Sequence, residues 1–130
     1  MIVDSSALIA VLLREPGWEG LFELLSDADY VGVGAPTLVE SGIVLSARVG
    51  IPGKTLLARM VQEGEFEIVP LTDAHWPVAV DAYLRFGKGR HPAALNFGDC
   101  LTYAVSRIAE EQLLYIGDDF SRTDLDLVDA

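Results

Sequence analysis

Short apolar runs alternate with helix-like segments along the whole chain, and this alternation limits the folds that are open to it. The runs cover residues 2–3, 30–33, 66–69 and 113–116. Short, continuously apolar strands separated by helices are typical of a parallel sheet that is covered by helices on both faces. We therefore predict an α/β fold with three layers, α/β/α, around a mainly parallel central sheet. Because no linker or internal repeat interrupts the pattern, we expect a single domain over residues 1–130.

The segments between the predicted strands carry apolar residues at helical spacing. Residues 7–13 are apolar throughout, which predicts a helix buried on every side. Two other predicted helices have these residues on their buried sides: Leu38, Leu45 and Val49 in the third, and Leu101, Ala104, Val105 and Ile108 in the last. Residues 125–128 are expected to form a final edge strand.

The composition excludes several classes of protein. With 51% hydrophobic residues in 130, the chain is neither disordered nor collagen-like. The longest apolar run, residues 7–13, is far shorter than the ~20 residues that a membrane span requires. One cysteine cannot make a disulfide framework or a cysteine-based zinc site, so the reducing cytoplasm is the expected location. A net charge of −11 argues against a broad basic surface for nucleic acid. It does not argue against a nuclease whose carboxylates hold metal ions.

Acidic residues recur where the predicted strands end. Asp4 follows the first strand, the pair at 118–119 follows the late strand, and Glu40 and Asp99 lie one turn into helices. In parallel α/β sheets, ligands bind beside the carboxyl ends of the strands. If the strands run parallel, these acids converge on one edge of the sheet.

Each acid also has an ordinary structural explanation. Asp4 can cap the first helix, and Glu40 can complete a capping box that begins at Thr37. Asn96 and Asp99 can form the same device, and residues 118–119 can be turn residues. Converging carboxylates would instead repel one another and favour a bound cation, for which Mg²⁺ or Mn²⁺ suits an all-oxygen site. Such a site can hydrolyse phosphodiester bonds. The residues alone leave both interpretations open.

Three segments resemble one protein family. Residues 2–8, which read IVDSSAL, resemble the start of PIN-domain ribonucleases. Residues 91–104, with LNFGDCLTYA, resemble the VapC branch, the toxins of bacterial and archaeal toxin–antitoxin pairs. Residues 113–124, with GDDFSRTD, match the closing motif of that branch. With Glu40 in the third helix, the resemblance implies a PIN-like fold and a Mg²⁺- or Mn²⁺-dependent ribonuclease.

The resemblance also implies roles for individual residues. Asp4 and Asp99 correspond to the metal-binding aspartates and Glu40 to the third acid of the family. Asp119 keeps its place beside a phenylalanine and is the preferred fourth acid, with Asp118 as the alternative. The remaining positions are supporting residues, which helix capping explains equally well: Ser5 and Asn96.

A local basic stretch supplies the candidate RNA contacts Arg85, Lys88 and Arg90, although a solvated loop has the same composition. The resemblance further implies a VapB-like antitoxin and a homodimer, and the net charge suits a cationic inhibitor. Two helical stripes are candidate interfaces, although core packing fits most of their residues: Trp18, Leu21, Phe22 and Leu25, and Leu56, Leu57, Met60 and Val61.

Two other functions compete with a ribonuclease. The first is a catalytically silent PIN-like binding module, which is disfavoured because all four acidic positions are filled. The second is an aspartate-based phosphatase. The D-x-D motif usual in phosphatases is absent after the first strand, where the sequence is Asp4-Ser5-Ser6. The sequence does not specify which RNA would be cut.

Overall fold

The computed structural model describes residues 1–129 and contains one sheet of four short parallel strands. The strands are β1 (Ile2–Val3), β2 (Gly32–Gly34), β3 (Glu67–Val69) and β4 (Leu113–Leu114), in the order β3-β2-β1-β4. The helices are α1 (Ser5–Leu12), α2 (Trp18–Asp27), α3 (Ala35–Val49), α4 (Pro52–Glu63), α5 (His75–Phe86) and α6 (Phe97–Ala109), followed by a short 3₁₀ helix, η1 (Phe120–Arg122).

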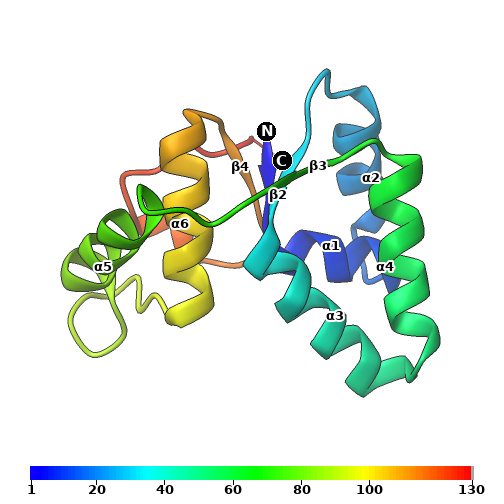
Figure 1. The fold of residues 1–130 in the computed structure, drawn as a ribbon, viewed down its shortest axis with the longest axis horizontal. Coiled ribbons are helices and arrows are strands. Elements are labelled where there is room, and N and C mark those ends of the chain that lie inside the picture. The colour runs from blue at the N-terminus through cyan, green and yellow to red at the C-terminus, as the bar shows by residue number, and fades with distance from the viewer. Residues whose placement is uncertain (130) are drawn as a thin grey trace.

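The sheet separates two helical layers, as Figure 1 shows, with α1 to α4 on one side and α5 and α6 on the other. Each layer has its own apolar core. Ile2 and Leu113 pack among residues of α5 and α6, whereas Val3 and Leu114 pack among residues of α1 to α4. Successive side chains of a strand point to opposite faces, so two-residue strands supply one residue to each core. The predicted three-layer α/β/α fold with a parallel sheet is confirmed.

The central position of β1 determines where the acids lie. Ile2 pairs with Gly32 of β2 and with Leu113 of β4. The backbone N–H of Asp4 donates to the carbonyl oxygen of Leu114 at 2.9 Å, so the carboxyl ends of β1 and β4 are adjacent. Helix α3 begins directly after β2, with Gly34 as its N-cap. The first turns of α3 therefore start from the same edge of the sheet.

Several details differ from the sequence-based expectations. Val49 and Ile108 were expected on buried faces but are 42% and 38% exposed. Both lie near the ends of helices that are longer than the strands of the sheet. Helix α3 has 15 residues and spans about 22 Å, whereas the three residues of β2 span about 10 Å. The last turns of such helices extend beyond the core.

Two further elements are shorter or less enclosed than expected. The predicted edge strand at 125–128 is reduced to one isolated bridge between Leu113 and Leu127, because β4 itself has only two residues to pair with. In α1 the residues Ile9 and Leu12 are half-buried, so that helix is not enclosed on every side. Within residues 1–129, no helix has the length and hydrophobicity needed to cross a membrane.

Candidate active site

Asp4 lies at the junction of β1 and α1 and is 5% exposed. It is the N-cap of α1, and its Oδ2 accepts hydrogen bonds from the backbone N–H of Ser6 at 3.1 Å and from the Ser6 hydroxyl at 2.6 Å. The predicted capping role of Asp4 is therefore correct. Both bonds are made to Oδ2, so a further ligand would be bound by Oδ1.

Ser6 links the two strand ends that carry acidic residues. Its hydroxyl donates to Asp4 and accepts a 3.0 Å hydrogen bond from the backbone N–H of Ile116, which follows β4. A supporting role was expected for Ser5, whereas the hydroxyl that contacts Asp4 belongs to Ser6. The available signal was the position of Ser6 two residues after an N-cap aspartate, where a side chain can reach back to the cap.

Asp99 is held at the start of α6 by a reciprocal pair of hydrogen bonds. The Asn96 Oδ1 accepts from the backbone N–H of Asp99 at 2.9 Å, and the Asp99 Oδ2 accepts from the backbone N–H of Asn96 at 3.0 Å. The predicted capping box is present. It fixes the Asp99 carboxylate at the N-terminus of the helix, beside the carboxyl edge of the sheet.

The capping explanation for Glu40 is wrong. Helix α3 begins at Ala35, before Pro36 rather than after Thr37, and no side chain caps it. Glu40 therefore has no part in a cap, and its carboxylate extends to the start of α6. A Cβ placed on Gly98 would lie 2.6 Å from the Glu40 Oε2. The absence of a side chain at Gly98 is what lets Glu40 approach Asp99, and no local pattern in the sequence predicts this role for the glycine.

A buried pair of hydroxyl groups joins α3 to α6 one helical turn away from Glu40 and Asp99. The Oγ1 atoms of Thr37 and Thr102 lie 3.3 Å apart, and the two residues are 5% and 1% exposed. Thr37 is three residues before Glu40, and Thr102 is three residues after Asp99. Each hydroxyl is thus one helical turn from an acid, so this contact helps to set the separation of the two carboxylates.

The electrostatics of Asp99 show that the acids are gathered. Burial is the largest cause that raises the pKa of Asp99, which lies at about 6 rather than 3.8, although the bond from the Asn96 backbone opposes the rise. The charges of Asp4, Asp119 and Glu40 raise this pKa further. Of the adjacent pair 118–119, it is Asp119 whose charge is among these leading causes. The charges of three carboxylates, from the end of β1, from α3 and from the segment after β4, therefore act on Asp99.

The carboxylates are not arranged as the ligands of a single metal ion. In the part of the chain that the structure describes, no three His, Cys, Asp or Glu side chains are placed as ligands of one metal ion. Asp4 and Asp99 each use one carboxylate oxygen in a hydrogen bond at a helix N-terminus. The negative charges of the carboxylates also repel one another. The donor set nevertheless consists only of carboxylate oxygens, which Mg²⁺ and Mn²⁺ prefer. The residues fit such a cation by their chemistry.

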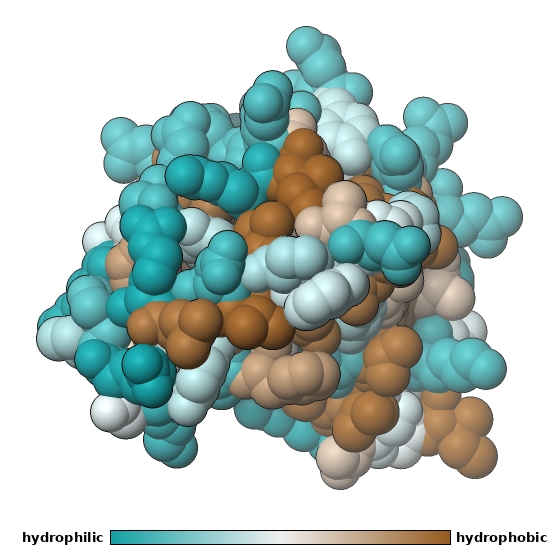
Figure 2. Space-filling model, turned by 60° about the vertical axis from the view of Figure 1, so that its left-hand side comes forward, coloured by the Kyte–Doolittle hydropathy of each residue, from teal (hydrophilic) through white to brown (hydrophobic). Residues whose placement is uncertain are grey.

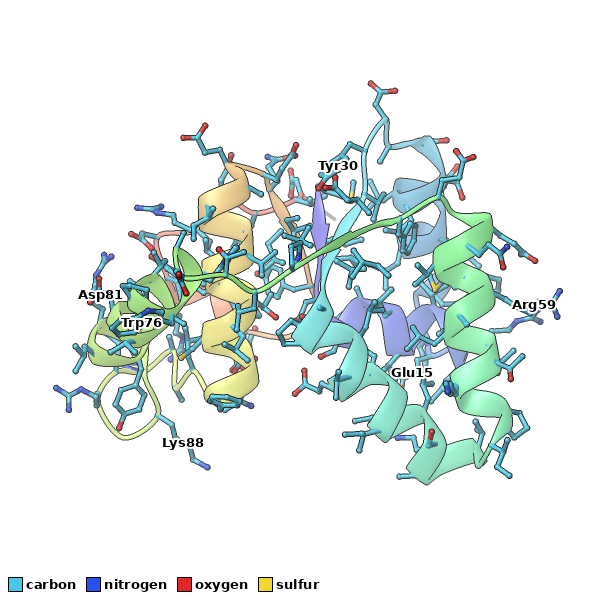
Figure 3. All side chains as sticks on the ribbon, in the orientation of Figure 1. Glu15, Tyr30, Arg59, Trp76, Asp81 and Lys88 are labelled. Carbon is cyan, nitrogen blue, oxygen red and sulfur yellow. The ribbon has the colours of Figure 1, made fainter. Side chains whose placement is uncertain are left out.

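The three candidate RNA-contacting residues have different surroundings. Lys88 extends from the loop after α5 into solvent (Figure 3) and lines the same pocket as Asn96 and Phe97 at the start of α6. Arg85 instead donates to Asp124 at 3.0 Å, and Arg90 donates to the backbone oxygen of Leu84 in α5 and lies over the ring of Tyr83. Within residues 1–129, Arg85 is the only one of the three in an ion pair, and Lys88 is the only one whose side chain makes neither an ion pair nor a hydrogen bond. It is the best placed of the three to meet a phosphate.

Comparison with known proteins shows which family this chain belongs to. The family model for the PIN domain matches residues 1–125, so the chain belongs to the PIN domain family. Several relatives within that family are VapC ribonucleases. Ribonuclease VapC36 of Mycobacterium tuberculosis is 42% identical over 127 residues, which cover 97% of this chain and 91% of that protein. Ribonuclease VapC28 of the same species is 40% identical over 124 residues, which cover 95% and 93%. The resemblance seen in the sequence motifs is confirmed.

Solved structures share the fold at lower identity. The crystal structure of M. tuberculosis VapC20, described as a sarcin–ricin loop cleaving toxin, superposes with a TM-score of 0.80 at 20% identity over 99% of this chain and 98% of that one. The VapBC2 complex of Rickettsia felis, bound to a DNA fragment from its promoter, gives a TM-score of 0.78 at 13% identity, covering 98% and 96%. At these identities the likeness concerns the fold.

Proposed function

We propose that this protein is the toxin of a VapBC-type toxin–antitoxin pair, a ribonuclease that uses Mg²⁺ or Mn²⁺ to hydrolyse RNA phosphodiester bonds. The observation that carries the proposal is the placement of Asp99, which is held at the start of α6 next to the Glu40 carboxylate and is close enough to Asp4 and Asp119 for their charges to raise its pKa. Gathered negative charge is unfavourable unless a cation offsets it. The 42% and 40% identical relatives that are named ribonucleases support the same function.

Within this proposal, Asp4 and Asp99 bind the cation, and Glu40 and Asp119 complete its acidic surroundings. When bound, the cation would stabilise the charge that develops on the phosphate oxygens during hydrolysis. The hydroxyl of Ser6 orients the Asp4 carboxylate, and the capping box of Asn96 orients that of Asp99. Asp118 remains the alternative to Asp119.

We further propose that a VapB-like antitoxin binds the groove between α2 and α4. Leu21, Leu25 and Leu57 are buried, so part of both predicted stripes belongs to the core, as expected. Phe22 and Leu56 are 51% and 40% exposed and line the groove, together with Leu25, Met60 and Phe66. A groove between helices with apolar walls suits an amphipathic helix. The net charge of −11 favours a cationic partner.

A homodimer is the second assembly in this proposal. Exposed hydrophobic side chains gather on the α5–α6 side of the molecule, as Figure 2 shows. They include Trp76, Val80, Leu84 and Phe97, which are 48–81% exposed. An apolar surface of this kind marks a protein interface. Sedimentation of the purified chain at twice the monomer mass would support the dimer, and a monomer at all concentrations would contradict it.

The proposed site of action of this toxin is the cytoplasm.

Cleavage assays with the purified protein test the activity. Defined transfer and ribosomal RNAs are incubated with Mn²⁺ or Mg²⁺ and, in parallel, with a chelator. We expect metal-dependent cleavage that Asp99→Asn reduces by more than about a hundredfold, because loss of an outer-shell partner alone costs 10–100-fold in metal sites. Cleavage that Asp99→Asn leaves unchanged would refute the site. Hydrolysis of a phosphomonoester without cleavage of RNA would instead support the phosphatase alternative.

A further inference from the structure

Asp124 connects the C-terminal segment to both helices of the α5–α6 layer. Its Oδ1 accepts a 2.6 Å hydrogen bond from the Tyr103 hydroxyl of α6. Its Oδ2 accepts hydrogen bonds from Arg85 of α5 at 3.0 Å and from Arg107 of α6 at 3.3 Å. Burial acts to raise the pKa of Asp124, but the bonds from Tyr103 and Arg85 outweigh it, so the pKa lies below its usual value. The carboxylate is therefore ionised at neutral pH, and bonds to an ionised acceptor are the stronger kind.

The three donors to Asp124 differ in strength. Arg85 and Arg107 have side chains that are 53% and 50% exposed, and ion pairs in such positions contribute little. Tyr103 is 2% exposed, and its ring packs in the core beside Phe86. The buried ring can hold its hydroxyl in one place without losing further side-chain freedom. The Tyr103–Asp124 hydrogen bond is therefore the main attachment.

This attachment holds the segment that carries Asp119. After β4 the chain passes through Gly117, at φ +109°, and residues 116–119 are exposed. The segment is fixed again at Phe120, which is 2% exposed and packs edge-on against Tyr115. The Thr123 hydroxyl donates to the carbonyl oxygen of Phe120 at 2.7 Å and so closes the turn that leads to Asp124. Phe120 anchors one end of this turn and Asp124 the other.

We infer that Asp124, held by Tyr103, is a positioning residue that keeps η1 against α6 so that the Asp119 carboxylate faces Asp99. The inference rests on the proposed function, because it concerns the same acidic site. Asp99 and Tyr103 are four residues apart on α6, so they lie on the same side of that helix. One helix thus places Asp99 directly and Asp119 through the bond to Asp124.

A purely stabilising role is the competing explanation. In that case, removal of the Tyr103–Asp124 bond would lower the melting temperature and leave the affinity of the acidic site for cations unchanged. The two explanations therefore differ in a property of the site, not in the stability of the protein.

Two variants and one control separate these explanations. Asp124→Asn removes the charge, and Tyr103→Phe removes the hydroxyl while keeping the ring in the core. Asp126→Asn is the matched control, because it removes the same charge from the same segment but its carboxylate contacts Gln112, outside α5 and α6. For each protein the Mn²⁺ dissociation constant is measured by calorimetry. Hydrogen exchange of the amides of residues 116–124 is measured without metal.

We expect Tyr103→Phe and Asp124→Asn to weaken Mn²⁺ binding by about tenfold, the lower end of the effect of outer-shell partners. We also expect faster exchange of residues 116–124, whereas Asp126→Asn matches the unmodified protein in both. If Asp124→Asn does not fold, Tyr103→Phe decides the result. Unchanged exchange, or faster exchange with unchanged Mn²⁺ affinity, would overturn the inference. Absence of Mn²⁺ binding by the unmodified protein would instead overturn the proposed function and, with it, this inference.

Discussion

The four acids of the site fall into two pairs that are held in different ways. Asp4 caps α1, and Asp99 is the partner of Asn96 in the capping box of α6, so local hydrogen bonds fix both residues whether or not a ligand binds. Glu40 and Asp119 cap no helix through a side-chain hydrogen bond, and they reach the site only because α3, α6 and η1 pack as they do. Capping explains the first pair without any function. It does not explain the second pair, whose proximity to Asp99 is unfavourable without a cation.

Among variants that keep all four acids, the largest expected effect on cleavage comes from disturbing the approach of Glu40 to Asp99. We predict that Gly98→Ala lowers metal-dependent cleavage by about 10–100-fold, the range for loss of a supporting contact in a metal site. The added Cβ would displace the Glu40 carboxylate, but the fold is retained because the clash is with the end of a flexible side chain. Alanine also favours a helix over glycine by up to about 1 kcal/mol, so the melting temperature should not fall.

Gly42→Ala is the matched control for that change. It makes the same substitution within a helix, where an added Cβ would meet Leu57 at an ordinary 3.7 Å. We expect its cleavage rate to equal that of the unmodified protein. Equal rates for Gly98→Ala and the unmodified protein would show that Glu40 does not need its position beside Gly98.

The second prediction compares how the capping residues and the second pair of acids contribute to the stability of the folded protein. Asn96→Ala removes the side-chain cap of α6 and should lower the free energy of unfolding by about 1 kcal/mol. Glu40→Gln removes a charge that opposes ionisation of Asp99, so it should leave the metal-free stability at pH 7 unchanged or raise it. Urea unfolding in chelator measures both. A loss of stability in Glu40→Gln as large as that in Asn96→Ala would contradict the division into pairs.

The third prediction follows from the pKa of Asp99. Because the folded protein raises this pKa from 3.8 to about 6, it binds the proton more tightly than the unfolded chain does. The corresponding stability is fully present below about pH 4 and is lost as the pH rises through about 6. Asp99→Asn, which keeps an oxygen for the cap, should therefore gain stability relative to the unmodified metal-free protein across this window. Thermal melts at pH 4, 5, 6 and 7 test it, and parallel curves would count against the raised pKa.

The smallest expected effect concerns Ser6. Ser6→Ala removes the hydroxyl that joins Asp4 to the backbone of Ile116. A hydrogen bond of this kind contributes about 1 kcal/mol, so we predict a modest loss of stability together with weaker Mn²⁺ binding. Ser5→Ala is the control and should change neither property. Equal effects of the two substitutions would remove Ser6 from the site.

Much of the fold could be predicted from the sequence because local patterns encode it. The short apolar runs placed all four strands, and the Asp4 cap and the Asn96–Asp99 box were visible as local motifs. The capping interpretation of Glu40 failed because Thr37 was taken as the N-cap of α3. A proline favours the first turn of a helix, so Pro36 was the signal for an earlier start.

The remaining parts of the site depend on contacts between distant segments. Three features of this kind join residues at least 21 positions apart in the sequence. They are the Thr37–Thr102 contact, the approach of Glu40 to Gly98 and the hydrogen bond from Tyr103 to Asp124. No periodicity or cap specifies such contacts. They follow from how α3, α6 and η1 pack, which the sequence pattern does not determine residue by residue.

Thermal unfolding with increasing Mn²⁺ tests the central claim most directly. A ligand that binds only the folded state stabilises it by about 2.7 kcal/mol at one hundred times its dissociation constant. We predict a rise in melting temperature with Mn²⁺ for the unmodified protein and no rise for Asp99→Asn. An identical rise in both proteins, or no rise in either, would show that the gathered carboxylates do not bind a divalent cation.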